Sequence, residues 1–315
     1  MIKVQNLTKQ YGSHRAVDNI SFEVGKGEIL GFLGPNGAGK STTMNILTGY
    51  LSATNGTVTI NGHDILENPN AAKASIGYLP EIPPLYPDMT VREYLNFMCD
   101  LKKCALPRQR HIAEICKVMK IEDVYNRLIK NLSKGYKQRV GMAQALIGNP
   151  PVLILDEPTV GLDPNQIIEI RSLIKTLGKH HTVILSSHIL PEVEAVCDRI
   201  VIINKGKIVA DDRTEDLAVK LSEDRRLMVT IEGPEKEVVE LISGIAGVEE
   251  VTVMANKATG VSDYAILVTE GVDVRRDLFV RLAQREWPLL SSKSMALTLE
   301  DIFINLTVKE NGGVQ

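Results

Sequence analysis

Short apolar runs and alternating apolar and polar positions predict strands through the first two thirds of the chain. Two of the runs, Ile29–Leu33 and Val152–Leu155, are continuously apolar. Runs of this kind indicate strands buried on both faces of a parallel sheet. The other segments with strand spacing are Ile2–Leu7, Ala16–Val24, Thr57–Ile60, Val183–Ser186 and Ile200–Ile203. Helical spacing falls between the strands, so the pattern predicts an α/β fold.

A long helical interval separates the two halves of this core, from about Pro83 to Leu132. The apolar positions spaced for one buried helix face are Val91, Tyr94, Leu95 and Met98. Four prolines between residues 80 and 87 precede them and indicate a stiff, turn-rich hinge. We therefore expect a helical subdomain, at about residues 83–150, inserted into the α/β core.

A second compact unit is predicted after about Leu217, over residues 218–315. Its elements are expected at Leu227–Ile231 (strand), Lys236–Ile245 (helix), Val248–Val253 (strand), Tyr264–Thr269 (strand), Val274–Ala283 (helix) and around Leu289 (strand). This βαββαβ order predicts a small α+β domain with a ferredoxin-like sandwich. A capping-box pattern at Thr298–Asp301 also predicts a short last helix that includes Ile302.

Composition excludes several classes of protein. The chain has 315 residues, 44% of them hydrophobic and 24% charged, which is ordinary for a globular protein. The formal charge of -3 offers no general attraction to nucleic acid, so no nucleic-acid partner is expected. The four cysteines lack zinc-site spacing. We expect the chain neither to be secreted nor to span a membrane by itself, since it has no apolar signal core and no run of 18 apolar residues. His180 and His181 are expected to lie exposed in a loop.

The strongest chemical signal is a phosphate-binding loop directly after the buried strand Ile29–Leu33. Residues Gly34–Thr42 fit the pattern G-x-x-x-x-G-K-[ST]. Glycines let backbone N–H groups face phosphates, and the following helix points its positive end at the same anion. Lys40 is expected to neutralise phosphate charge, and Ser41 to bind Mg²⁺ through its hydroxyl. The predicted nucleotide contacts in this loop are Gly34, Asn36, Gly37, Ala38, Gly39, Lys40, Ser41 and Thr42.

Two adjacent carboxylates end the buried strand Val152–Leu155. Successive side chains of a strand diverge, so Asp156 and Glu157 can perform different tasks. Asp156 is expected to hold Mg²⁺, and Glu157 to accept a proton from the attacking water. The alternative is that these acids are only a polar strand end that opens a turn.

A third element, Leu132–Arg139, resembles the LSGGQ signature of ABC-transporter ATPases. Smaller motifs of that family appear in order: Tyr11 where an aromatic ring stacks on adenine, Gly161–Asp163 as the D-loop, and Ser187–His188 with the switch histidine. The resemblance covers residues 1–217. It implies a P-loop NTPase core of ABC type that binds ATP and Mg²⁺. It also implies that His188, Glu157 and Lys40 are the catalytic residues. Tyr11 as strand-end packing and His188 as a structural histidine remain alternatives.

The resemblance also implies a head-to-tail homodimer. In it, Ser133 and Gly135 cap the γ-phosphate held by the other subunit, and Asp163 belongs to the same shared site. Three positions depart from the family pattern, two in the signature and one at residue 81. Lys134 and Tyr136 replace a glycine and a glutamine of the signature, and Glu81 stands where the family has a glutamine that senses Mg²⁺ and water. A carboxylate can coordinate Mg²⁺, so Glu81 is counted with Ser41 and Asp156 as a metal ligand.

The function implied by the resemblance is the ATP-hydrolysing subunit of a membrane transporter. Its partner would be an integral-membrane permease, which would hold the chain at the cytoplasmic, inner face of the cell membrane. The segment Leu297–Phe303 is similar to the ending of bacterial exporter ATPases of the multidrug, sodium, lipid and gliding-motility groups, which favours export. Two alternatives stay open: a soluble ABC switch ATPase not coupled to transport, and an importer ATPase whose C-terminal domain senses a ligand.

Overall fold

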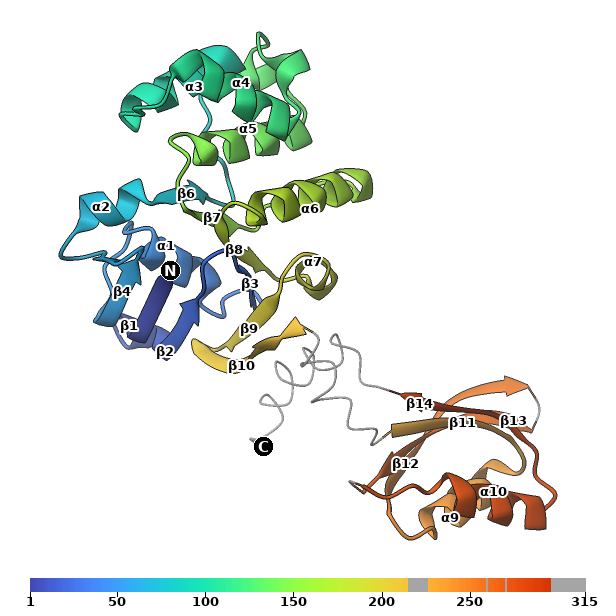
Figure 1. The fold of residues 1–315 in the computed structure, drawn as a ribbon. Coiled ribbons are helices and arrows are strands. Elements are labelled where there is room, and N and C mark those ends of the chain that lie inside the picture. The colour runs from blue at the N-terminus through green and yellow to red at the C-terminus, as the bar shows by residue number, and fades with distance from the viewer. Residues whose placement is uncertain (215–225, 259, 270, 296–315) are drawn as a thin grey trace. The chain divides into compact units, whose positions relative to one another are not determined.

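The computed structural model describes residues 1–214, 226–258, 260–269 and 271–295 (Figure 1). These residues fall into two compact units, one within residues 1–214 and the other within residues 226–295. The first is an α/β unit and the second an α+β unit, which confirms the predicted fold class. The predicted boundary at residue 217 and the predicted last helix near Ile302 lie outside the described residues.

A six-stranded sheet in the order β10-β9-β3-β8-β7-β6 forms the centre of the first unit. Its strands are β3 (Ile29–Leu33), β6 (Ile76–Leu79), β7 (Val152–Asp156), β8 (Thr182–Ser187), β9 (Arg199–Asn204) and β10 (Lys207–Arg213). The pairs from β9 to β6 are parallel, and only β10 runs antiparallel to its neighbour. Every residue of β3, β7 and β8 is buried, as expected for apolar strands in the middle of a parallel sheet.

A four-stranded antiparallel sheet in the order β2-β1-β4-β5 packs on the central sheet. Its strands are β1 (Ile2–Tyr11), β2 (His14–Val24), β4 (Asn55–Ile60) and β5 (His63–Asp64). The helix α1 (Lys40–Leu47) contributes Met44, Ile46 and Leu47 to the core shared by the two sheets. The apolar side chains of the two sheets and α1 therefore form one continuous core, which fixes the loop before α1.

The predicted helical subdomain consists of three helices and two short 3-10 turns. These are α3 (Val91–Leu101), α4 (Arg108–Met119), the turns Glu122–Val124 and Ile129–Asn131, and α5 (Lys134–Leu146), drawn in green in Figure 1. The predicted apolar face of α3 is buried. Helical structure begins at Val91 rather than near Pro83, because Thr90 and Glu93 form a capping box that starts α3. The remaining helices of the first unit are α2 (Pro69–Ala74), α6 (Pro164–Gly178) and α7 (Leu190–Glu194).

The C-terminal end of α5 is hydrogen-bonded to β6 and packs closely against it. The side-chain amide of Gln144 donates to the carbonyl of Tyr78 at 2.6 Å. A Cβ on Gly77 would collide with the carbonyl oxygen of Ala145, so only glycine permits this approach of strand and helix. The ammonium of Lys102 donates to the carbonyl of Gln144 at 2.6 Å, and burial lowers the pKa of Lys102 to about 8. The helix end is thus held from both sides.

The second unit contains the predicted βαββαβ order. Its elements are β11 (Arg226–Glu232), α9 (Glu235–Ser243), β12 (Val248–Ala258), β13 (Val261–Val268), α10 (Arg275–Gln284) and β14 (Leu289–Met295). The sheet order is β12-β13-β11-β14, and every pair is antiparallel. Val238 and Ile242 of α9 and Leu278 of α10 pack with buried side chains of the sheet. This arrangement is the predicted ferredoxin-like sandwich.

One exposure predicted from the sequence is wrong. His181 is buried, and its Nδ1 lies 2.7 Å from the carbonyl oxygen of Pro150, whereas His180 is exposed as expected. Burial lowers the pKa of His181, so the neutral ring is favoured there. Among the described residues, no helix has the length and apolarity needed to cross a membrane.

Candidate active site

The carboxyl ends of β3, β8, β7 and β6 bring the predicted motifs to one edge of the central sheet. Because these strands are neighbours and parallel, the segments that follow them meet there. The pocket at this edge has a volume of about 450 Å³, within the usual range for small-molecule sites. Its lining residues are Tyr11, His14, Ala16, Asn36, Gly37, Gly39, Lys40, Ser41, Thr42, Glu81, Glu157, Val160 and His188.

The loop before α1 has the backbone that a phosphate site requires. Gly37 and Gly39 have φ angles of +80° and +109°, which L side chains rarely adopt. A Cβ on Gly39 would lie 2.5 Å from the carbonyl oxygen of Ala16, so this turn also depends on the absence of a side chain. The first N–H groups of α1 have no partner within the helix and are suited to an anion. Gly34 and Ala38 do not line the pocket; they lie against the core behind it.

Lys40 is the first residue of α1 and is buried. Its ammonium donates to the carbonyl oxygens of Gly34 at 2.8 Å and Pro35 at 3.3 Å. The same nitrogen lies 3.4 Å from Oε1 of Glu157. The loop therefore fixes a positive charge at the pocket, opposite the predicted general base.

Glu157 adopts a conformation that is uncommon for a residue other than glycine. Its φ is +48°, and its backbone N–H donates to the hydroxyl of Ser186 at 3.0 Å. Left-handed backbone at such a residue costs of the order of 1 kcal/mol or more and is enriched at functional sites. The carboxylate of Glu157 is 2.9 Å from Nδ1 of His188 and, through its other oxygen, faces Lys40. The turn after β7 thus aims this buried carboxylate into the pocket.

The side chain of Asp156 points in a different direction from that of Glu157, as the alternation of side chains along a strand predicts. It is buried and accepts a hydrogen bond from the hydroxyl of Ser186. Burial raises the pKa of Asp156, hydrogen bonds from Ser186 and Ser41 oppose the shift, and the negative charges of Glu157 and Glu81 add to it. A cation beside Asp156 would therefore stabilise its ionised form.

The donor set fits Mg²⁺. Ser41 and Asp156 supply a hydroxyl and a carboxylate close to one another. Ser41 and the exposed Glu81 line the pocket, whereas Asp156 is buried and does not line it. Such hard oxygen donors suit Mg²⁺, which keeps several waters and binds through one or two carboxylates together with phosphates. Within the described residues there is no group of three or more His, Cys, Asp or Glu side chains that could hold a metal ion by itself. The protein's donors would therefore complement those of a bound nucleotide.

Three pocket residues have no counterpart in the motifs. His14 and Ala16 come from the start of β2, and Val160 follows Glu157 by three residues. Tyr11 ends β1 beside them and is 46% exposed, with the ammonium of Lys9 located 5.2 Å from its ring centroid. The sequence carried no signal for His14 or Ala16, since they reach the pocket only through the pairing of β1 with β2.

Comparison with known proteins agrees with this pocket. A family model described as ABC transporter matches residues 17–160. The chain is 40% identical over 213 residues to the bacitracin transport ATP-binding protein BcrA of Bacillus licheniformis, covering 67% of this chain and 69% of that protein. It is 34% identical to the linearmycin resistance ATP-binding protein LnrL of Bacillus subtilis, with 98% of each covered. The chain belongs to the ABC transporter family.

A solved structure extends this result to the level of the fold. It is the dimeric ATP-binding cassette described as a post-hydrolysis state bound to ADP and Pi, which matches with a TM-score of 0.62 and 28% identity. The match covers 68% of this chain and 99% of that one. The chain is therefore an ATP-binding subunit of ABC type with ATPase activity, as the P-loop and the signature predicted.

The ABC signature and the D-loop lie together, but neither lines the pocket. Ser133 caps the N-terminus of α5 and accepts a hydrogen bond from the N–H of Tyr136 at 3.4 Å. Asp163 likewise caps α6 and accepts from the N–H of Gln166 at 3.0 Å. A Cβ on Gly135 would lie 2.8 Å from the side chain of Gln166, so the two helix starts are in close contact. The ABC subunit thus has two separate surfaces for the predicted nucleotide contacts.

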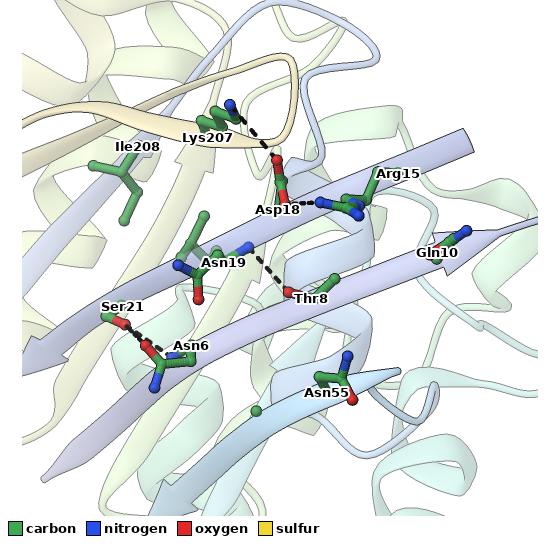
Figure 2. A pocket seen from close by; sticks show the side chains of 12 residues that line it. Asn6, Thr8, Gln10, Arg15, Asp18, Asn19, Ser21, Asn55, Lys207 and Ile208 are labelled. Atoms are coloured by element: carbon green, nitrogen blue, oxygen red, sulfur yellow. Dashed lines mark hydrogen bonds and ion pairs between the residues drawn. The ribbon is translucent and has the colours of Figure 1, made fainter. Parts of the chain in front are cut away.

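The ABC core has a second hollow, on the outer side of β1 and β2 (Figure 2), with a volume of about 1050 Å³. Its charged lining residues pair with one another: Asp18 is 2.8 Å from Arg15 and 3.6 Å from Lys207. The backbone N–H of Asn19 donates to the hydroxyl of Thr8 at 3.0 Å. None of the residues predicted from the motifs lines this hollow. It is a polar sheet face with internally paired charges, unlike the pocket at the P-loop.

Proposed function

We propose that this chain powers an ABC exporter as a homodimer that closes on two ATP molecules and reopens after hydrolysis. The observation that carries the proposal is the carboxylate of Glu157. It is buried, held at a left-handed backbone position, and placed between Lys40 at 3.4 Å and His188 at 2.9 Å. A carboxylate beside a positive charge, in a pocket formed by a phosphate-binding loop, supports the role of a base for Glu157.

The proposed roles follow from this geometry. Glu157 accepts the proton of the attacking water, because its carboxylate lines the pocket beside Lys40 and His188. His188 orients that carboxylate through the contact at Nδ1 and lies on the pocket side of it. Lys40 balances charge that builds on the phosphate oxygens. Tyr11, exposed at the pocket rim, offers a ring face for the adenine base.

Mg²⁺ is the proposed metal, held by Ser41 and Asp156 with Glu81 at the rim. When bound, it neutralises charge on the phosphates and polarises them toward attack. In its absence, ATP hydrolysis should fall to background. Addition of EDTA and then of excess Mg²⁺ tests the requirement directly: hydrolysis that continues in EDTA contradicts a metal-dependent mechanism.

The proposed dimer uses the second surface. Ser133, Gly135 and Asp163 lie outside the pocket of their own chain. Ser133 and Asp163 are exposed, which supports contact with a nucleotide held by another copy, whereas Gly135 is buried against the start of α6. Light scattering on purified Glu157→Gln protein tests this: ATP should double the measured mass. Lys40→Ala in the same background should stay monomeric with ATP. A dimer that forms equally in Lys40→Ala, or none in Glu157→Gln, contradicts the ATP-dependent closure.

Export through a permease is the proposed cellular role. It is supported by relatives whose names state bacitracin transport and linearmycin resistance, the second aligned along 98% of this chain, including the C-terminal unit. The permease would place the chain on the cytoplasmic face of the cell membrane. Affinity purification of Glu157→Gln protein from detergent-solubilised membranes, in the presence of ATP and Mg²⁺, should recover a multi-spanning protein in stoichiometric amount.

The same purification separates the alternatives. Recovery of soluble partners only would favour a switch ATPase that is not coupled to transport. Recovery of a permease together with an external binding protein would favour an importer. Either outcome contradicts export.

A further inference from the structure

A buried carboxylate lies behind the predicted catalytic residues without lining the pocket. Glu192 belongs to the short helix α7 and is 4% exposed. Its Oε2 accepts hydrogen bonds from the hydroxyls of Thr159 and Ser187, the second at 3.5 Å. Both partners are buried as well. A single carboxylate oxygen therefore joins two segments, the turn after β7 and the end of β8 at its last residue, Ser187.

The first of these segments carries Glu157. Thr159 is two residues further along, in a turn in which the N–H of Val160 donates to the carbonyl of Glu157 at 3.2 Å. The N–H of Leu162 then donates to the carbonyl of Thr159 at 3.2 Å, at the start of the D-loop. A contact that holds Thr159 therefore fixes the turn on which the left-handed backbone of Glu157 depends.

The second segment carries His188. Ser187 precedes it directly, and the Ser187 hydroxyl, while donating to Glu192, accepts the backbone N–H of Ile189 at 3.0 Å. These two bonds flank His188 and define the direction in which its ring leaves the backbone. The distance of 2.9 Å between His188 and Glu157 thus depends on two turns that Glu192 links.

We propose that Glu192 is a positioning residue for ATP hydrolysis: it locks the turn after Glu157 to the turn that carries His188. The proposal rests on the roles proposed above for those two residues. A carboxylate is costly to bury unless it is hydrogen-bonded, so its place among buried hydroxyls suits a group that orients its partners. Because the carbonyl of Thr159 accepts the N–H of Leu162 in the D-loop, Glu192 connects the hydrolytic pair to the surface proposed to meet the second subunit.

The experiment compares steady-state hydrolysis by the full chain and its variants over a range of Mg-ATP concentrations. Glu192→Ala should lower kcat by about tenfold or more with KM for ATP within about twofold, since the phosphate loop is untouched while the catalytic geometry loosens. Glu192→Gln keeps an oxygen that accepts from Thr159, and it should recover most of kcat. Glu194→Gln is the matched control, because Glu194 is an exposed acid on the same helix and should leave kcat unchanged.

A double variant distinguishes positioning from simple loss of stability. Thr159→Val alone should lower kcat, and adding it to Glu192→Ala should cause little further loss, because both remove the same contact. An unchanged kcat in Glu192→Ala, additive losses in the double variant, or no recovery in Glu192→Gln would each refute the positioning role. Glu157→Gln is measured alongside. If it hydrolyses ATP normally, the proposed function itself fails; if it is inactive while Glu192→Ala is normal, only the positioning role fails.

Discussion

Replacement of Glu157 by glutamine is the most informative single change in the pocket. The two side chains have nearly the same volume, so the buried turn after β7 need not repack. The amide can still hydrogen-bond to His188, which lies 2.9 Å away. Lys40 keeps the carbonyl oxygens of Gly34 and Pro35 as partners after it loses the carboxylate. The change therefore removes a base while leaving the surrounding contacts in place.

The expected loss can be estimated from this geometry. A positioned general base contributes about 10²- to 10⁴-fold to a rate, which corresponds to about 2.7–5.4 kcal/mol of activation free energy. ATP binding should change little, because the phosphate loop and Lys40 do not depend on Glu157 for their hydrogen bonds to the backbone. The loss should appear in kcat rather than in KM.

The assay is release of phosphate at saturating Mg-ATP, with nucleotide affinity measured separately by titration. The control is Glu194→Gln, the same substitution at an exposed glutamate that has no proposed part in hydrolysis. A Glu157→Gln rate within a factor of about three of the parent rate would refute the assignment of a general base, because a positioned base typically contributes about 10²-fold or more. Equal losses of affinity and rate would instead indicate a structural role for the carboxylate.

Three further predictions concern the loop, a helix start and the pH dependence of stability. Gly39→Ala should weaken ATP binding by about tenfold or more in a nucleotide titration, because φ is +109° there and a Cβ would meet the carbonyl of Ala16; unchanged affinity would contradict the strain argument. Thr90→Ala removes the cap of α3 and should lower the free energy of unfolding in urea by about 1 kcal/mol; a loss below the error of the measurement would mean that the cap is not needed. Burial lowers the pKa of His111 below its ordinary value of 6.5, and its Nε2 accepts the N–H of Gly148 at 3.0 Å. The folded protein therefore favours the neutral form of this ring. Its stabilising contribution is therefore full above about pH 6.5 and lost as the pH falls below it; the melting temperature should drop from pH 7 to pH 5, and less steeply in His111→Gln.

The sequence predicts the central strands β3, β7 and β8 because their burial is uniform. The strand Ile29–Leu33 is found at the predicted residues, since a continuously apolar run between polar turns has no other stable place than the middle of a sheet. β6 escaped prediction because Gly77 interrupts a run of only four residues, and the glycine is explained only by its contact with Ala145. β10 escaped because it is an edge strand whose residues are half exposed and largely polar.

The site is predictable where a residue acts through its immediate neighbours in the chain. The loop residues Gly37 and Lys40, and Glu157 directly after β7, follow local patterns, and the fold brings them together in one pocket as the parallel topology requires. His14 and Glu192 lie beyond such patterns, because each reaches its partners only through strand pairing or helix packing that no short motif encodes. His181 was placed wrongly for the same reason: its acceptor, the carbonyl of Pro150, is 31 residues away.

The contacts between α5 and β6 fix the C-terminal end of that helix, so the helix can tilt only about this end. The bond from Gln144 to Tyr78 and the close contact at Gly77 fix the helix where the strand leading to Glu81 lies. Ser133 stands at the opposite end, about 18 Å away along a helix that rises 1.5 Å per residue. A tilt of about 10° at the fixed end would sweep the signature serine through about 3 Å, enough to make or break a hydrogen bond. A tilt at the end of α5 that contacts β6 is therefore felt as a displacement of about 3 Å at the surface proposed to meet a second subunit.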